Sequence, residues 1–320
     1  MRQPFLTTLI DMHSYMRPAG SATESLFIDH YLANIPGISR DPYGNWRIAI
    51  DDTPVLWSCH TDTVHHDSGR QSTHYDDATG MLSLSKRSKR RSSCLGADDT
   101  AGVFIMREMI RRNVPGSYVF HFGEEQGCIG SRDLAEYDPS WLSQFDMAIA
   151  LDRGGCHDVI THQIGNRCAS DLFVKSLADA LFAADKRVIL SPAHGVYTDT
   201  ASYVDIIPEC TNLSVGYSGA HGRSESLNCW HVLRLLDTLC QLDTTQLTID
   251  RDPDADTALA NVFIDIDDCN ITTDCGDWRY LPETMPEVWD DDYTGDDDRS
   301  LYLDPSYASI QLALRRYNAR

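Results

Sequence analysis

The sequence has no stretch that approaches eighteen consecutive apolar residues, so it predicts no membrane-spanning helix. It is also a poor candidate for a secretory leader, because Asp11, His13 and Arg17 follow closely on the short apolar run near the N-terminus. Ten cysteines are scattered without a Cys-x-x-Cys pair, which argues against structural zinc on cysteine and against a disulfide framework. We therefore expect a cytoplasmic protein with mostly buried thiols and no membrane partner.

Basic residues are scarce, with 27 Lys and Arg against 48 Asp and Glu, and the formal net charge is −21. Nucleic-acid binding needs a basic face, so we expect no nucleic-acid partner. The acid is concentrated near the C-terminus, where residues 249–299 hold 17 Asp or Glu and three Arg, an excess of 14 negative charges. We predict a boundary near residue 248, between a main domain over residues 1–248 and an acidic C-terminal extension over 249–320.

The chain does contain enough apolar residues, 42%, to form a proper core, and its strand-like and helix-like patterns alternate. Ser21 and Glu24 form a capping-box sequence that predicts the start of one helix. Strands are expected at residues 46–50, 55–59, 117–122, 147–151, 188–190 and 212–215, and helices at 26–32, 101–112, 172–184 and 227–242. This alternation predicts an α/β fold with a mostly parallel sheet flanked by helices.

His60 follows directly on the buried strand expected at 55–59, and Asp62 lies two residues further on. Ligand sites of parallel sheets lie just beyond the carboxyl ends of their strands. If the chain is still extended there, Asp62 points to the same side as His60 and can accept a hydrogen bond from its imidazole. Taken alone, a His-x-Asp sequence is better explained by a structural histidine.

Two pairs of adjacent carboxylates come next. Asp98 and Asp99 stand before the helix expected at 101–112, where one aspartate could be an ordinary N-cap and Asp98 could bridge two cations. Glu124 and Glu125 follow the strand expected at 117–122 and would repel each other in an apolar setting unless cations lie nearby. One glutamate could then be a ligand while its neighbour takes a proton from water. A solvated loop is the alternative interpretation of the glutamate pair.

Asp152 ends the strand expected at 147–151, and His221 follows the strand expected at 212–215. Each could be incidental, but four expected strands are followed by a His or a carboxylate at the same sheet edge, and Asp98 joins them beside a helix start. Two histidines and three carboxylates suit zinc, or alternatively cobalt or manganese. The sequence thus predicts two divalent metal ions bound by a set of five ligands: His60, Asp98, Glu125, Asp152 and His221.

The same residues occur in the order seen in the co-catalytic metallopeptidases of families M20 and M28, which the chain resembles over about residues 15–242. The resemblance implies that His60 and His221 bind one metal each, that Asp98 bridges the metals, and that the Asp98–Asp99 peptide is cis. It also implies that Glu125 and Asp152 complete the two sites, that Glu124 is the general base and that Asp62 orients His60. Residues 153–220 are too few for the lid domain that many M20 enzymes insert, so we expect a lidless fold of the zinc aminopeptidase type. The motifs do not separate M20 from M28.

The resemblance implies a metal-dependent hydrolase that cleaves amide bonds of peptides, of the exopeptidase type, with a metal-bridging water activated by Glu124. Residues 1–248 would then be the catalytic domain. One alternative is an amidase or deacylase that acts on N-acyl small molecules, and another is a non-catalytic binding or structural protein that retains the fold. Arg153 could pair with a substrate carboxylate, although an exposed structural role is favoured, and Asp199 could form a hydrogen bond near the site.

Overall fold

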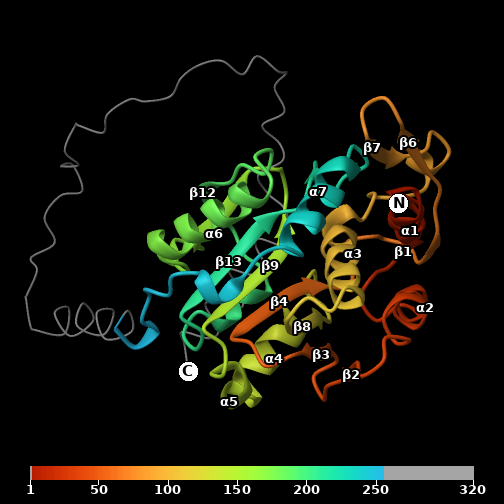
Figure 1. The fold of residues 1–320 in the computed structure, drawn as a ribbon. Coiled ribbons are helices and arrows are strands. Elements are labelled where there is room, and N and C mark those ends of the chain that lie inside the picture. Colours follow the sequence, from red (N-terminus) through yellow and green to blue (C-terminus); the bar gives the residue numbers. More distant parts are fainter. Residues whose placement is uncertain (1, 256–320) are drawn as a thin grey trace, which may run out of the picture. The chain divides into compact units, whose positions relative to one another are not determined.

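The computed structural model describes residues 2–255 of the chain (Figure 1). Its α-helices are α1 Arg2–Met12, α2 Ala22–Tyr31, α3 Ala97–Arg111, α4 Ile129–Tyr137, α5 Pro139–Leu142, α6 Asp171–Ala184 and α7 Cys229–Leu239. Short 3-10 helices are η1 Ser88–Arg90, η2 Asp199–Tyr203 and η3 Thr244–Gln246. The strands are β1 Tyr15–Met16, β2 Ser39–Arg40, β3 Trp46–Ile50, β4 Val55–His60, β5 Gly69–Arg70, β6 Thr73–Asp76, β7 Met81–Leu84, β8 Gly116–His121, β9 Met147–Arg153, β10 Asp158–Gln163, β11 Asn166–Arg167, β12 Ser191–Gly195, β13 Glu209–Ser214, β14 Tyr217–Ser218 and β15 Ser226–Asn228.

The main sheet has the strand order β11-β10-β13-β9-β4-β8-β3-β2, and β12 pairs with β10. Its four central strands, β13, β9, β4 and β8, are parallel, whereas β10 and β3 join them antiparallel on either side. Every residue of β4 and β13 is buried, as expected for strands covered on both faces. The α/β prediction is confirmed, with a parallel centre and antiparallel outer strands.

Helices cover both faces of the sheet, which produces two separate apolar cores. Because side chains alternate along a strand, Val55 and Trp57 of β4 face one core while Leu56 faces the other. The first core lies beneath α1, α2, α3, α6 and α7, and the second lies beneath α4, α5 and η2. In Figure 1, α3 lies across β4 and β9.

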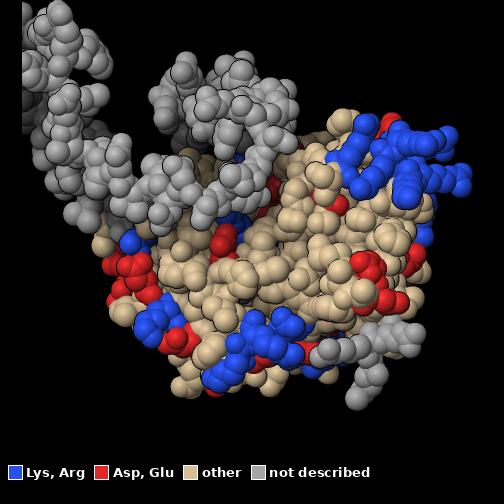
Figure 2. Space-filling view, turned by 90° about the horizontal axis from the view of Figure 1, so that it is seen from above, with Lys and Arg blue, Asp and Glu red and all other residues tan. Residues whose placement is uncertain are grey.

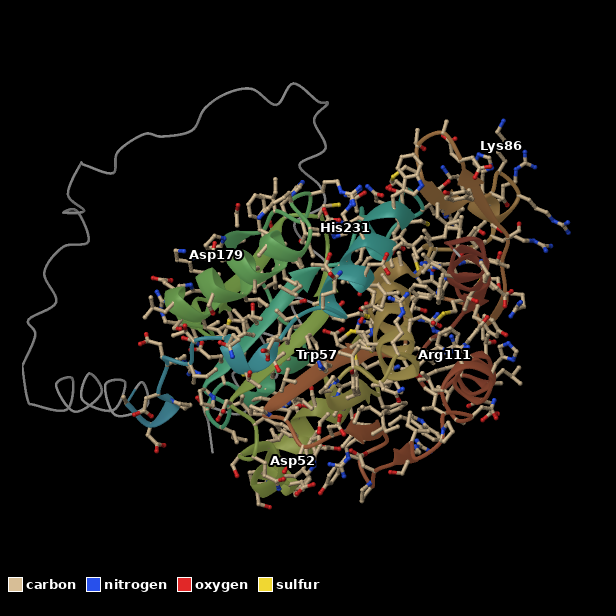
Figure 3. All side chains as sticks on the ribbon, in the orientation of Figure 1. Asp52, Trp57, Lys86, Arg111, Asp179 and His231 are labelled. Carbon is tan, nitrogen blue, oxygen red and sulfur yellow. The ribbon has the colours of Figure 1, made fainter. Side chains whose placement is uncertain are left out.

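A small antiparallel sheet, β14-β15-β7-β6, lies at one end of the first layer (Figure 1). The run after β7 is basic, and its Lys86, Arg87 and Arg91 side chains are exposed. Figure 3 shows Lys86 pointing away from the body of the protein, and Lys and Arg gather over this end in Figure 2. The β15 strand connects this sheet to the loop that carries His221.

Several predicted elements were misplaced or missed. The strand expected at 188–190 is wrong, because Val188 and Leu190 are buried core residues of the connection between α6 and β12. The true strand β12 is a polar edge strand whose sequence has no apolar pattern. The helix expected from residue 227 begins only at Cys229, since residues 226–228 form β15 and Asn228 caps the helix by accepting from the N–H of His231. Helix α1 was not predicted at all, although Leu9 and Met12 are fully buried.

No separate domain interrupts the chain between Asp152 and His221, because β10, β11, β12 and β13 of that interval all join the main sheet and α6 covers it. The lidless prediction is therefore confirmed. Eight cysteines lie within residues 2–255, and all are free thiols, six of them buried. None of the helices within these residues has the length and hydropathy of a membrane span. The boundary near residue 248 stays a prediction, and most of the acidic extension, residues 256–320, lies outside the described part of the chain.

Candidate metal centre

The four parallel central strands deliver the predicted ligands to one edge of the sheet. His60 is the last residue of β4 and Asp152 is the second-to-last residue of β9. Glu125 follows β8 by a few residues. His221 follows β13 and the short strand β14. Asp98 reaches the same place from the start of α3, and its peptide bond to Asp99 is cis, as expected. Neighbouring parallel strands end side by side, which is why residues far apart in sequence meet here.

His60 contacts two carboxylates through one ring nitrogen. Its Nε2 lies 3.1 Å from Oδ1 of Asp98 and 3.5 Å from Oδ1 of Asp152. The imidazole is 1% exposed. These three side chains form the first half of the candidate centre.

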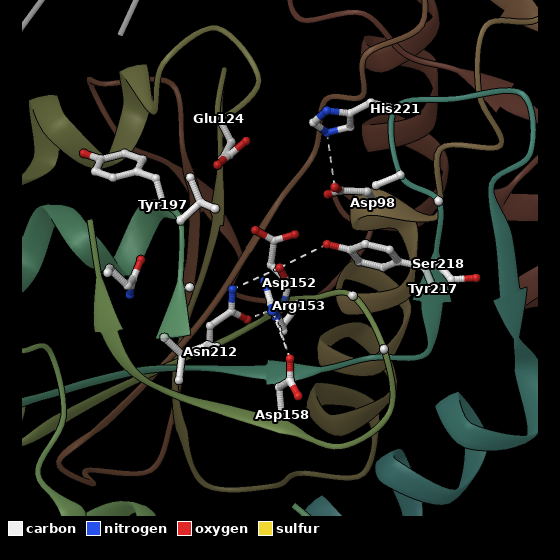
Figure 4. Close-up of a pocket in the computed structure, with 18 residues that line it drawn as sticks. Asp98, Glu124, Asp152, Arg153, Asp158, Tyr197, Asn212, Tyr217, Ser218 and His221 are labelled. Atoms are coloured by element: carbon white, nitrogen blue, oxygen red, sulfur yellow. Dashed lines mark hydrogen bonds and ion pairs between the residues drawn. The ribbon is translucent and has the colours of Figure 1, made fainter. Parts of the chain in front are cut away.

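His221 contacts the other oxygen of the same aspartate (Figure 4). Its Nε2 lies 3.3 Å from Oδ2 of Asp98 and 3.3 Å from Oε2 of Glu125. Asp98 therefore presents one carboxylate oxygen to each histidine, as the bridging role implied by the resemblance requires. The five predicted ligands converge on one place.

Asp62 connects His60, at the end of β4, with the loop that carries Glu124 and Glu125. Nδ1 of His60 lies 3.2 Å from the backbone oxygen of Asp62, its hydrogen-bond partner, and 3.5 Å from Oδ1 of the Asp62 carboxylate. This carboxylate also accepts the backbone N–H groups of Glu124, at 3.1 Å, and Glu125, at 3.2 Å. The second pair of contacts was not predicted, because nothing in the local sequence relates Asp62 to a loop 62 residues away.

The site carries far more negative than positive charge. Burial alone would raise the pKa of Asp98, but hydrogen bonds from His221 and His60 hold it well below its ordinary value. Burial raises the pKa of Glu125 to about 7 and that of Asp152 to about 6. Hydrogen bonds to Asp98 and Glu125 raise the pKa of His221 to about 11. Cations bound among these carboxylates would stabilise their charged forms.

The residues present fit divalent metal ions. His60, Asp98 and Glu125 offer ligand atoms within 4.8 Å of one another, and so do His60, Asp99 and Asp152. Within residues 2–255, Oε1 of Glu125 and Oδ1 of Asp152 are buried without a hydrogen-bond partner. Imidazole nitrogens and carboxylate oxygens are the donor set that zinc accepts in hydrolytic sites.

Glu124 borders the same space as the ligands, as Figure 4 shows. Its Oε2 lies 3.9 Å from Nε2 of His60, and its Oε1 accepts a weak hydrogen bond from Sγ of Cys128 at 3.5 Å. Burial raises its pKa well above the ordinary value. A carboxyl group with this surrounding can accept and return a proton at neutral pH.

A cavity of about 610 Å³ opens beside these groups, lined by Asp98, Glu124, Asp152 and His221 at one end. Arg153 also lines it, and its Nη2 lies 2.9 Å from Oδ2 of Asp158. Arg153 is therefore half-buried and ion-paired rather than free at the surface. Asp199 is buried near these groups, burial raises the pKa of its carboxyl to about 8, and its hydrogen bond near the site stays a prediction.

Two residues that hold the site were missed. The side chain of Asn212 accepts the N–H of Asp152 at 2.9 Å and donates to its C=O at 2.9 Å, which fixes the backbone of this ligand in the sheet. Glu225 accepts the backbone N–H of Asp98 at 3.1 Å. Asn212 was predicted only as part of a strand, and its pairing with β9 could have been found only from the sheet order. Glu225 follows His221 by four residues, but the spacing of residues in a loop does not predict where the Glu225 side chain points.

A lidless α/β sheet that gathers two histidines and several carboxylates at its carboxyl edge defines a metal-dependent hydrolase. Residues 44–231 match the model of peptidase family M28, and the chain belongs to this family. The match decides between the two families that the motifs left open. The protein is thus a metallopeptidase of the exopeptidase type, and metal ions are its cofactors.

Solved structures with the same fold include three peptidases. Aminopeptidase PepT from Bacillus cereus is 13% identical with a TM-score of 0.61, over 75% of this chain and 97% of that chain. A tripeptidase from Staphylococcus aureus is 14% identical with a TM-score of 0.57, over 75% of this chain and 97% of that chain. An aminopeptidase from the archaeon Desulfurococcus kamchatkensis is 13% identical with a TM-score of 0.54, over 80% and 98%. No curated protein matches the chain in sequence.

Proposed function

We propose that this protein is a di-zinc exopeptidase in which His60, Asp98 and Asp152 hold one metal and His221, Asp98 and Glu125 hold the other. The observation that carries the proposal is the placement of Asp98, whose two oxygens lie 3.1 Å and 3.3 Å from the two histidines. Cobalt or manganese would suit the same donors. When bound, the metals would lower the pKa of water and polarise the carbonyl of the scissile amide.

Glu124 would act as the general base and Asp62 as the residue that orients His60. Glu124 takes a proton from the water that attacks the amide carbon, and returns it to the nitrogen that leaves when the C–N bond breaks. Its position at the border of the cavity supports this role. Asp62 supports it indirectly, since it holds the backbone N–H of Glu124 as well as the His60 ring.

The experiment is a substrate panel on metal-free protein to which zinc, cobalt or manganese is added back. Peptides with free or blocked termini distinguish an aminopeptidase from a carboxypeptidase, and N-acyl amino acids test for the deacylase alternative. Peptides that lose single terminal residues in a metal-dependent way support the proposal. Turnover that is unaffected by removal of the metals, or confined to N-acyl amino acids, would contradict it.

The names of the structural neighbours include aminopeptidases and a tripeptidase, and short peptides are therefore the substrates to test first. We also propose the cytoplasmic location expected from the sequence, which fractionation of producing cells would check.

We propose that residues 1–248 form the catalytic domain and 249–320 a separate acidic extension. The N–H groups of Asp250 and Arg251 donate to Glu209 at 2.9 Å and 3.0 Å, so the extension begins with a tie to the catalytic domain. A chain ending at residue 255 keeps these hydrogen bonds and one ending at 248 loses them. We expect both to bind metal, with the shorter chain less stable by about 2–4 kcal/mol, as measured by urea unfolding. Loss of metal binding in the chain ending at 255 would contradict the proposal.

A further inference from the structure

Glu225 is a fully buried carboxylate that accepts four consecutive backbone N–H groups. Its Oε2 accepts from Leu95 and Gly96 at 2.8 Å each, and its Oε1 accepts from Ala97 at 2.8 Å and Asp98 at 3.1 Å. Gly96 has left-handed backbone angles, φ 72° and ψ 33°, which help to turn successive N–H groups toward one point. The segment before α3 thus forms a concave anion site, and Glu225 fills it.

This contact joins the two loops that carry ligands. The accepted N–H groups belong to the segment that ends at Asp98, and Glu225 itself lies four residues after His221. Nε of Arg223 donates to the C=O of Ser92 at 3.2 Å, a second tie between the same two loops. The distance from the bridging carboxylate to His221 is therefore set by these ties between loops.

A carboxylate is needed for this geometry. A glutamine in place of Glu225 would keep one acceptor oxygen, but its NH2 group would face two N–H donors and could accept from neither. Buried backbone donors that lose their acceptor cost free energy, and here they lie in the residues that place Asp98. The loop that carries Glu225 and His221 would then lose its fixed position relative to Asp98.

We propose that Glu225 is a positioning residue that sets the metal affinity of the half formed by His221 and Glu125 without touching a metal. The inference rests on the ligand set of the proposed function. His60 and Asp152 sit on strands, and the sheet holds them in place when the tie at Glu225 is lost. His221 lies in a loop, at a positive φ of 64°, and depends on the tie.

The chain offers a matched control in Glu209, which is also fully buried and accepts four hydrogen bonds. It accepts the N–H of Ser170 at 2.7 Å, the hydroxyl of Ser170 at 2.7 Å, and the N–H groups of Asp250 and Arg251. Glu209 is the first residue of β13, at the end of the sheet opposite to the metal ligands. Glu209→Gln therefore removes the same chemistry away from the candidate metal centre.

The test is titration of the metal-free full chain with Zn²⁺ by calorimetry and with Co²⁺ by absorption, for wild type, Glu225→Gln and Glu209→Gln. We expect wild type and Glu209→Gln to bind two equivalents alike. In Glu225→Gln the second equivalent should bind about 10–100-fold more weakly, and the first should change far less. Thermal unfolding of the metal-free proteins should show that the two variants lose similar stability.

Equal weakening of both equivalents, an unchanged second equivalent, or the same loss in Glu209→Gln would overturn the inference. If Glu225→Gln does not fold, Glu225→Asp answers the same question, because it keeps the charge but reaches fewer of the four N–H groups. A second equivalent weaker than in wild type supports the inference, and an equal one overturns it. A wild-type chain that binds fewer than two equivalents would instead contradict the proposed function.

Discussion

The two halves of the candidate metal centre are built in different ways. His60 and Asp152 lie on adjacent central strands, and their side chains are 1% and 7% exposed. His221 lies in a loop with its side chain 47% exposed, and its partner Glu125 is in the loop after β8. The first half is positioned by the hydrogen-bonded sheet. The second half is positioned by two buried carboxylates, Asp62 and Glu225, which accept hydrogen bonds from the backbone of the loops. One half of the centre is therefore held by the sheet itself, while the other half depends on single side chains.

The largest effect is expected from Glu124→Gln, which alters neither half. The variant keeps all five proposed ligands but cannot take a proton, so kcat should fall about 10²–10⁴-fold while two equivalents of metal remain bound. Peptidase assays and metal analysis of the same samples measure both quantities. Full activity would remove Glu124 from its proposed role, and loss of metal would place it among the ligands.

A direct comparison of the halves is His221→Ala against His60→Ala. We expect each variant to retain one equivalent of metal, because each keeps three ligands of the other half, including Asp98. The equivalent retained by His221→Ala should bind about 10-fold more tightly, since its ligands are held by the sheet. Calorimetric titration measures this, with His194→Ala as a control that removes an exposed imidazole. Equal affinities, or the reverse order, would break the distinction between the halves.

The sheet-held half can be weakened at Asn212, whose side chain pairs with both backbone groups of Asp152. Asn212→Ala leaves the buried N–H of Asp152 without its acceptor, while the C=O of Asp152 keeps the Tyr217 hydroxyl at 3.2 Å. We expect a loss of about 1–3 kcal/mol in the free energy of unfolding. The metal equivalent on His60 and Asp152 should weaken more than the other. Thr211→Val in the same strand removes a buried hydrogen bond to Ile160 and serves as the control. A change confined to the His221 half would contradict the assignment.

A pH effect on the stability of the fold is expected from His13, which lies outside both halves of the candidate metal centre. His13 is fully buried in the N-terminal region, and burial lowers its pKa to about 3, below the value of about 6.5 in the unfolded chain. Between these values the unfolded state binds the proton and the native state does not. Stability is therefore complete above pH 6.5 and falls as the pH drops toward 3, by about 1.4 kcal/mol per pH unit.

Unfolding of wild type and His13→Asn in urea at several pH values checks this. The variant should lose stability less steeply over the same pH window, by about the contribution of one histidine. Parallel pH profiles for the two proteins would show that His13 is not the group responsible.

Much of the fold and the site could be predicted because the information is local. The buried strand before His60 and the acidic pairs at 98–99 and 124–125 are patterns of a few residues, and strand-end positions follow from them. The edge strand β12 could not be predicted, because a polar strand that pairs on one side has no apolar repeat. Helix α1 was missed for a related reason, since its two fully buried residues give little periodicity.

The sequence by itself determined the chemistry of this protein, which is the set of two histidines and paired carboxylates and the order in which the strands deliver them. Only the tertiary structure decided how firmly each ligand is held. Glu225 meets the backbone of residues 95–98 across 127 to 130 positions of sequence, and Asn212 meets Asp152 across 60. Such contacts depend on which loops and strands become neighbours in the folded chain. No local pattern of residue types records that, and so the difference between the two halves of the metal centre became visible only in the structure.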